Sequence, residues 1–178
     1  QGLKDDSHRL PQSIFIQTIS GGYATEGEEE LPNEVYNPTD IDVILRSDFN
    51  TIRIVPWYDD PTAQVICDAV SLNGSPITNS SRYVLKNILK IYDDKGLIPI
   101  VSPEIEFYLV KTNSDPDYPL EVPIGQSGRQ ETGKQAFGID AINEFDPLFE
   151  DLYNYCEAQN IEIDTMNHES GSAQMEIN

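Results

Sequence analysis

Residues 102–110, with the sequence SPEIEFYLV, decide how the fold is interpreted. Glu104 and Glu106 are separated by one residue, so on a β-strand both side chains leave the same face, roughly 7 Å apart. Ile105 and Phe107 then point to the opposite face, where they can join a core. The segment therefore predicts a strand with one polar and one apolar face.

Residues 174–178, QMEIN, repeat this pattern, with Gln174 and Glu176 on one face and Met175 and Ile177 on the other. Each segment by itself also fits an ordinary half-exposed strand, and this alternative stays open. Glutamate is nevertheless a poor strand former, and both segments are otherwise built from residues typical of buried sheets. We therefore expect these acids to have a function.

Carboxylates that converge on one site cannot all stay ionised without a cation, because like charges and desolvation raise their pKa values. A site made only of oxygen ligands suits hard ions such as Mg²⁺ or Mn²⁺, which also accompany nucleotide phosphates. Zinc is not expected, since only His8 and His168 could add nitrogen ligands. Cys67 and Cys156 are far apart in sequence and are interpreted as core thiols.

On the N-terminal side of this stretch, short segments rich in β-branched and aromatic residues predict strands at 13–19, 51–57 and 64–70. Residues 20–40 contain Gly, Pro and consecutive acids and predict a long exposed loop. After them, apolar residues at helical spacing predict an amphipathic helix over 81–95, with Gly96 as its C-cap.

The remaining segments alternate between extended, loop and helical patterns. Residues 97–110 predict extended structure, and residues 111–136, with three prolines, predict a long loop. Asp146 followed by Pro147 predicts the start of a helix that runs to about Gln159. Two strand-like segments close the sequence, at 161–166 and 174–178. This order predicts two domains of α+β type.

The composition excludes several classes of function. The 178-residue chain carries a formal net charge of −20, and nucleic-acid binding depends on clusters of Lys and Arg, so nucleic acid is not an expected partner. No apolar run approaches the roughly 18 residues that span a bilayer, and no secretory signal is recognised at the start. A cytoplasmic location with no membrane association is therefore expected.

Two motifs resemble one known family. SPEIEFYL resembles the Glu-x-Glu-Phe strand motif of the glutamine synthetase family, and HESGSAQMEIN, residues 168–178, resembles its later metal-site segment. Residues 127–165 also resemble the family, especially a divergent branch that includes enzymes attaching glutamate to polyamines (gamma-glutamylpolyamine synthetases). Residues 46–69 are similar to the last strands of the family's N-terminal β-grasp domain.

The resemblance implies a fold with two parts. Residues 1–78 would form a small β-grasp-like N-terminal domain whose first strand precedes Gln1. Residues 79–178 would form the first part of an antiparallel-sheet catalytic domain with flanking helices, truncated at Asn178. Only the N-terminal part of the family's chain is then expected here, and the nucleotide- and glutamate-binding residues beyond it cannot be named.

The resemblance also implies a set of metal ligands. Glu104 would ligate the metal between the ATP phosphates, and Glu106, Glu169 and Glu176 the metal on the glutamate side; Glu169 is assigned by resemblance alone. Gln174 and His168 are candidate substrate-binding residues, although a surface Gln and a structural His are open alternatives. No general acid or base is assigned, because the glutamates are metal ligands in this scheme.

The activity implied is an ATP-dependent ligation, in which phosphorylated glutamate reacts with ammonia or an amine to form a gamma-glutamyl amide. The family's Asp-Gly-Ser-Ser loop, which serves ammonium, is not found near residues 20–40, so a polyamine is a serious alternative. Another alternative is an inactive relative with a binding or structural role. The intact protein is expected to form a homo-oligomeric ring, and this chain alone to be inactive.

Overall fold

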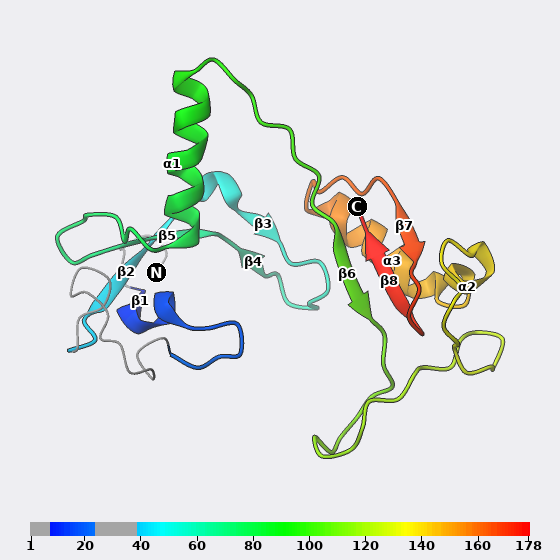
Figure 1. The fold of residues 1–178 in the computed structure, drawn as a ribbon. Helices are drawn as coiled ribbons and strands as arrows, with labels where there is room; N and C mark the ends of the chain where they lie inside the picture. Colours follow the sequence, from blue (N-terminus) through cyan, green and yellow to red (C-terminus); the bar gives the residue numbers. More distant parts are fainter. Residues whose placement is uncertain (1–7, 24–38) are drawn as a thin grey trace. The chain divides into compact units, whose positions relative to one another are not determined.

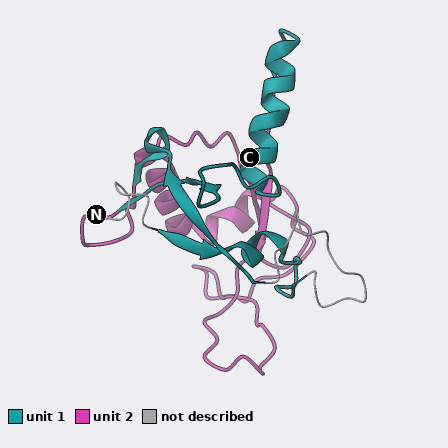
Figure 2. Ribbon diagram, turned by 90° about the vertical axis from the view of Figure 1, so that its left-hand side faces the viewer, with its two compact units in different colours: residues 1–53, 63–100 teal, residues 54–62, 101–178 magenta. Residues whose placement is uncertain are grey.

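The computed structural model describes residues 8–23 and 39–178. The chain divides into two compact units, one of residues 1–53 and 63–100 and one of residues 54–62 and 101–178 (Figure 2). Each unit contains an antiparallel sheet, as the α+β prediction requires. No helix in the described ranges combines the length and the apolar character needed to cross a membrane.

The sheet of the first unit has β2 (Asp42–Ser47) at its centre, between β1 (Arg9–Pro11) and β5 (Cys67–Val70) (Figure 1). Both neighbours pair with β2 in antiparallel register. Val43 of β2, 2% exposed, packs with Ala69 and Ile77 in a small core. Two short strands, β3 (Arg53–Ile54) and β4 (Ala63–Gln64), form a separate pair.

Several N-terminal predictions were wrong in detail. The strand predicted at 13–19 is instead the 3₁₀ helix η1 (Gln12–Ile16). The carboxylate of Asp40 explains this difference, because it accepts hydrogen bonds from both the backbone N–H and the hydroxyl of Ser13, each at 2.9 Å. The central strand β2 was not predicted at all, since it directly follows the loop-like segment.

The other N-terminal predictions were partly confirmed. Within the strand predicted at 51–57, only Arg53–Ile54 form a strand, β3, and Thr51 is the last residue of the short 3₁₀ helix η3 (Phe49–Thr51). The strand predicted at 64–70 is divided between the end of β4 and the whole of β5. Most of the loop predicted over 20–40 lies outside the described residues.

The predicted amphipathic helix is confirmed as α1 (Ser81–Asp94). Gly96 ends it as predicted: its φ is +67°, and the N–H groups of Gly96 and Leu97 donate to the carbonyls of Asp93 and Tyr92, as in a Schellman motif. Arg82 Nε and Lys86 Nζ bind the carboxylate of Asp68 on β5, at 3.0 and 2.6 Å. These ion pairs hold the start of α1 against β5 within the first unit.

The sheet of the second unit consists of β6 (Ile105–Tyr108), β8 (Gln174–Ile177) and β7 (Met166–His168), with β8 in the centre (Figure 1). Both pairings are antiparallel. The predicted strands at 97–110 and 174–178 are thus confirmed over shorter lengths. The strand predicted at 161–166 is largely wrong, since β7 begins only at Met166.

Two helices complete the second unit. α3 (Asp146–Ala158) starts with Pro147 in its first turn, as predicted, whereas the short α2 (Ile139–Asn143) was not predicted. Residues 54–62 belong to this unit because they pack on α3: the rings of Trp57 and Tyr155 are 5.8 Å apart. Gln159 at the end of α3 donates to the carbonyl of Ile54, at 2.8 Å.

The core of the first unit gives a test of the fold. Val43→Ala removes about two methylene equivalents from a buried site and leaves a cavity, so the free energy of unfolding should fall by about 2 kcal/mol. Val101→Ala is the matched control, because Val101 is 83% exposed. Urea denaturation followed by far-UV circular dichroism measures both. Equal losses in the two variants would contradict the assigned core.

Candidate functional site

The polar face of the second sheet carries the candidate site. Glu106 on β6 lies directly opposite Glu176 on β8, and Glu176 in turn lies opposite Asn167 on β7. Tyr108 and Gln174 form the next cross-strand pair on the same face. Antiparallel pairing therefore brings together the two strand patterns that the sequence predicted.

A diagonal hydrogen bond orients the amide of Gln174. Its Nε2 donates to Glu106 Oε2 at 2.7 Å, and its Oε1 accepts from the N–H of Gly171 at 2.8 Å. A Cβ atom added to Gly171 would lie 2.7 Å from both Gln174 Oε1 and the Tyr108 ring. A larger residue at this position would therefore force the Gln174 amide or the Tyr108 ring to shift on the polar face.

Glu169 joins the same face just beyond the end of β7. Its backbone N–H donates to the carbonyl of Gln174 at 2.7 Å, which extends the pairing of β7 and β8 by one residue. A hydrogen bond with the Glu176 side chain, loss of solvent, and the charges of Glu176 and Glu106 together raise the pKa of Glu169. A backbone hydrogen bond at Ser170 acts in the opposite direction. Three carboxylates are therefore crowded together.

Glu104 lies just before β6, two residues from Glu106, at an exposed position. Among the described residues, no hydrogen bond or ion pair is found that joins Glu104 to the other carboxylates. The structure thus brings together Glu106, Glu169, Glu176 and Gln174 and leaves Glu104 at the edge of the group.

His168 lies on the opposite face of the sheet. It pairs with Met175, and both residues are 0% exposed. Nδ1 lies 2.6 Å from the carbonyl oxygen of Glu169, and Nε2 lies 3.2 Å from Glu131 Oε1. Because strand residues alternate between faces, the ring of His168 points away from the carboxylates. In this structure it has no free polar atom for the substrate contact that the sequence suggested.

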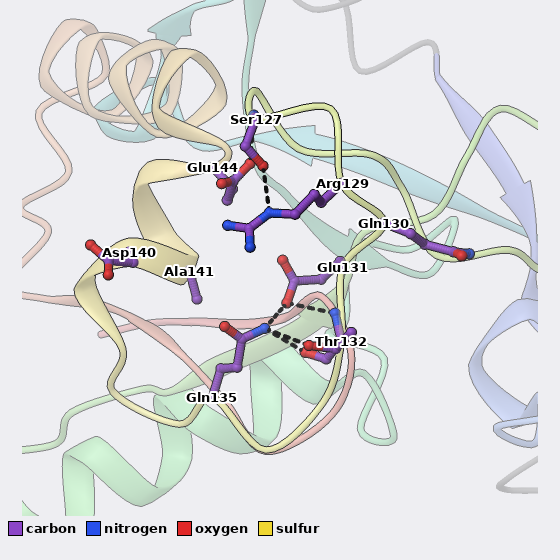
Figure 3. Close-up of a pocket in the computed structure, with 9 residues that line it drawn as sticks. All are labelled: Ser127, Arg129, Gln130, Glu131, Thr132, Gln135, Asp140, Ala141 and Glu144. Carbon is purple, nitrogen blue, oxygen red and sulfur yellow. Dashed lines mark hydrogen bonds between the residues drawn. The ribbon is translucent and has the colours of Figure 1, made fainter.

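Glu131 lies in the long loop and forms part of the wall of a cavity of about 170 Å³ beside α2 (Figure 3). Its Oε1 accepts from the N–H of Thr132 at 3.0 Å and from Gln135 Nε2 at 2.6 Å. Arg129 and Glu144 line the same cavity. A backbone hydrogen bond from Ser127 lowers the pKa of Glu144.

The donor set of the polar face fits a hard divalent ion in its chemistry. Glu106, Glu169 and Glu176 offer only oxygen atoms, and the pKa of Glu169 is raised first by its hydrogen bond with Glu176 and further by loss of solvent and by the charges of Glu176 and Glu106. In the described part of the chain, however, no group of three or more His, Cys, Asp or Glu side chains is already arranged to hold a metal ion. The carboxylates would have to draw closer around a cation.

Sequence reasoning missed two members of this face. Tyr108 is two residues beyond Glu106, so the same alternation could have placed it there. Asn167 becomes visible only through its pairing with Glu176, because nothing in residues 161–168 fixes the strand register. Glu131 has no signal in the sequence, since its burial depends on how the long loop folds.

The crowding of the carboxylates can be tested directly. Glu176→Gln removes both the hydrogen bond and the charge that raise the pKa of Glu169, so this pKa should fall toward its usual value. Carboxyl ¹³C NMR titration of the chain measures the change. Glu150→Gln, on the exposed side of α3, is the control and should leave Glu169 unaffected. An unchanged titration in Glu176→Gln would refute the contact between Glu169 and Glu176.

The raised pKa also fixes the sign of a pH effect. The folded chain binds the Glu169 proton more tightly than the unfolded chain does. Protonation of Glu169 therefore stabilises the fold fully below the unfolded pKa, and this stabilisation is lost as the pH rises through the folded pKa. A divalent cation would compete with this proton and relieve the same repulsion.

Comparisons with known proteins identify the family. The glutamine synthetase catalytic-domain model matches residues 78–178. The gamma-glutamylputrescine synthetase of Escherichia coli strain K12 is 28% identical over 173 residues, which are 95% of this chain and 35% of that enzyme. The glutamine synthetase of Halobacterium salinarum is 31% identical over 140 residues, 77% of this chain and 29% of the relative. This chain therefore spans about a third of the length of these relatives.

A solved structure of a novel glutamine synthase homolog agrees in fold, with a TM-score of 0.66 and 16% sequence identity over 99% of this chain and 36% of that chain. The mixed helical and antiparallel-sheet fold is therefore the one found in this family. Since the catalytic-domain model also covers more than half of the sequence, the chain belongs to the glutamine synthetase family.

Proposed function

We propose that the intact protein is an ATP-dependent ligase that joins glutamate to ammonia or an amine through a gamma-glutamyl phosphate. The crowding of Glu106, Glu169 and Glu176 on one sheet face carries this proposal, because such a cluster of acids suits a divalent cation. Membership of a family that includes the gamma-glutamylputrescine synthetase supports the reaction type.

Glu106, Glu169 and Glu176 would hold Mg²⁺ or Mn²⁺ on the glutamate side, and Glu104 would contribute to a second ion beside the ATP phosphates. When bound, the ions neutralise charge on the transferred phosphoryl group and hold the reactants in line. Glu104 lies just before the first residue of β6, at the edge of the group of carboxylates, and this position supports its role as a ligand of the second ion.

Gln174 and His168 take different roles in this proposal. Gln174 donates to Glu106, so its amide fixes one carboxylate oxygen and leaves the other free for a cation or substrate group. It lies on the polar face, where substrate contact is sterically possible. His168 is buried on the other face, and we propose that it stabilises the site without contacting the substrate.

The amine is the least constrained part of the proposal. The Asp-Gly-Ser-Ser loop that serves ammonium is not found near residues 20–40, and this favours a polyamine over ammonia as the nitrogen donor. An inactive relative with a binding or structural role is the competing hypothesis, and the retained carboxylates argue against it.

The remaining features of the intact protein follow from the family as proposals. They are a β-grasp-like domain over 1–78, a catalytic domain that starts with 79–178, assembly into a homo-oligomeric ring and a cytoplasmic location. Neither nucleic acid nor a membrane is proposed as a partner, given the net charge of −20.

Metal binding can be measured on this chain by itself. Titration with Mn²⁺, followed by electron paramagnetic resonance, should detect a site whose affinity falls about tenfold or more in Glu106→Gln, Glu169→Gln or Glu176→Gln, because each variant removes one charged ligand. Glu150→Gln is the matched control on α3. If the three variants bind as the control does, these carboxylates are not the ligands.

The reaction requires the intact protein. Glutamate-dependent phosphate release from ATP should be measured with ammonium, putrescine, longer polyamines and simple alkylamines in turn. We expect the highest kcat/KM with a polyamine. A clear preference for ammonium would establish a glutamine synthetase instead, and no stimulation by any amine would favour the inactive relative.

A further inference from the structure

The buried Glu131 is unusual for its surroundings. It is 7% exposed, although the loop around it is largely solvent-accessible, and among the described residues it is the one buried carboxylate. A buried carboxylate is costly unless donors surround it. Here Oε1 accepts hydrogen bonds from the Thr132 N–H and from Gln135 Nε2, and it lies 3.2 Å from His168 Nε2 (Figure 3 shows the first two contacts).

His168 connects this carboxylate to the polar face. A backbone carbonyl can only accept, so Nδ1 must donate to the carbonyl oxygen of Glu169, 2.6 Å away. On the other side of the ring, Nε2 lies within hydrogen-bond distance of Glu131 Oε1, at 3.2 Å. The orientation of the His168 ring is therefore fixed from both sides.

The backbone of Glu169 is in turn fixed at both of its peptide groups. Its N–H donates to the carbonyl of Gln174 at 2.7 Å, and its carbonyl accepts from His168. The loop is also attached on each side of Glu169, because the N–H of Lys134 donates to the carbonyl of Ser170 and that of Phe137 to the carbonyl of His168, each at 2.8 Å. With its backbone held in this way, Glu169 directs its side chain toward that of Glu176.

We propose that Glu131 and His168 are positioning residues for Glu169: the buried carboxylate orients the imidazole, and the imidazole holds the Glu169 carbonyl so that its side chain stays beside Glu176. This inference rests on the proposed metal-binding function. It adds that the long loop controls the geometry of the carboxylates without touching any bound ion.

Two substitutions of His168 separate positioning from simple loss of packing. The amide of Asn reaches about as far as Nδ1, so His168→Asn can keep the bond to the Glu169 carbonyl and lose that to Glu131. The longer Gln reaches about as far as Nε2, so His168→Gln can keep the bond to Glu131 and lose that to Glu169. Each variant retains one of the two hydrogen bonds.

The Mn²⁺ affinity of the chain should therefore fall in the order wild type, His168→Asn, His168→Gln, with the last reduced roughly 10- to 100-fold, as is typical of residues that orient metal ligands. Thermal melting of each variant is recorded alongside, and similar melting temperatures for the two variants exclude stability as the cause. Equal affinities of the two variants, or the reverse order, would overturn the inference.

Glu131→Gln supplies a second variant if neither substitution of His168 folds. It preserves volume and one acceptor oxygen but removes the charge, so it should also weaken Mn²⁺ binding. Glu144→Gln is the matched control, because Glu144 lines the same cavity but accepts from the N–H of Ser127 and, within the described ranges, makes no hydrogen bond to His168. Identical behaviour of Glu131→Gln and Glu144→Gln would contradict a role for Glu131.

A readout independent of metal separates this inference from the proposed function. At one fixed pH, the carboxyl ¹³C chemical shift of Glu169 reports its contact with Glu176, and it should move in His168→Gln and much less in His168→Asn. If the wild-type chain binds no Mn²⁺, the proposed metal site fails, yet the chemical shifts still decide whether His168 positions Glu169. An unchanged shift in His168→Gln overturns the positioning role.

Discussion

The antiparallel pairing of β8 with β6 and β7 is the interaction on which the candidate site depends. Its register sets Glu106 against Glu176 on one face and Phe107 against the fully buried Met175 on the other. A slip of one residue would bring charge into the core and expose the apolar side chains, so burial strongly disfavours any other register. The apolar face thereby determines which carboxylates meet on the polar face.

This arrangement places fold stability and function in opposition. Like charges that face each other across strands are destabilising, and here Glu106 faces Glu176 with Glu169 close by. The amide of Gln174 satisfies one oxygen of Glu106, and the proton held by the raised pKa of Glu169 relieves part of the repulsion at lower pH. A bound cation would relieve the repulsion without that proton, so metal binding and the folded sheet should support each other.

Local periodicity explains which features the sequence could predict. Alternation placed Glu106, Gln174 and Glu176 correctly, because side-chain direction in a strand depends only on neighbouring residues. The same rule could not reveal that His168 faces the core, since the strand predicted at 161–166 ended before His168, whereas β7 runs from Met166 to His168. The strand expected at 13–19 failed because a distant group, Asp40, stabilises a 3₁₀ turn. The burial of Glu131 likewise depends on contacts 37 residues away.

The polar face by itself is too open for the proposed chemistry. Tyr108 is 60% exposed, and Glu104 and Glu106 are also accessible to water. An acyl phosphate formed there would be open to hydrolysis, and the electrostatic effect of bound ions would be weakened by solvent. Phosphoryl transfer to glutamate therefore requires a second surface that covers this sheet and excludes water. Relatives about three times as long as this chain have the length to supply one.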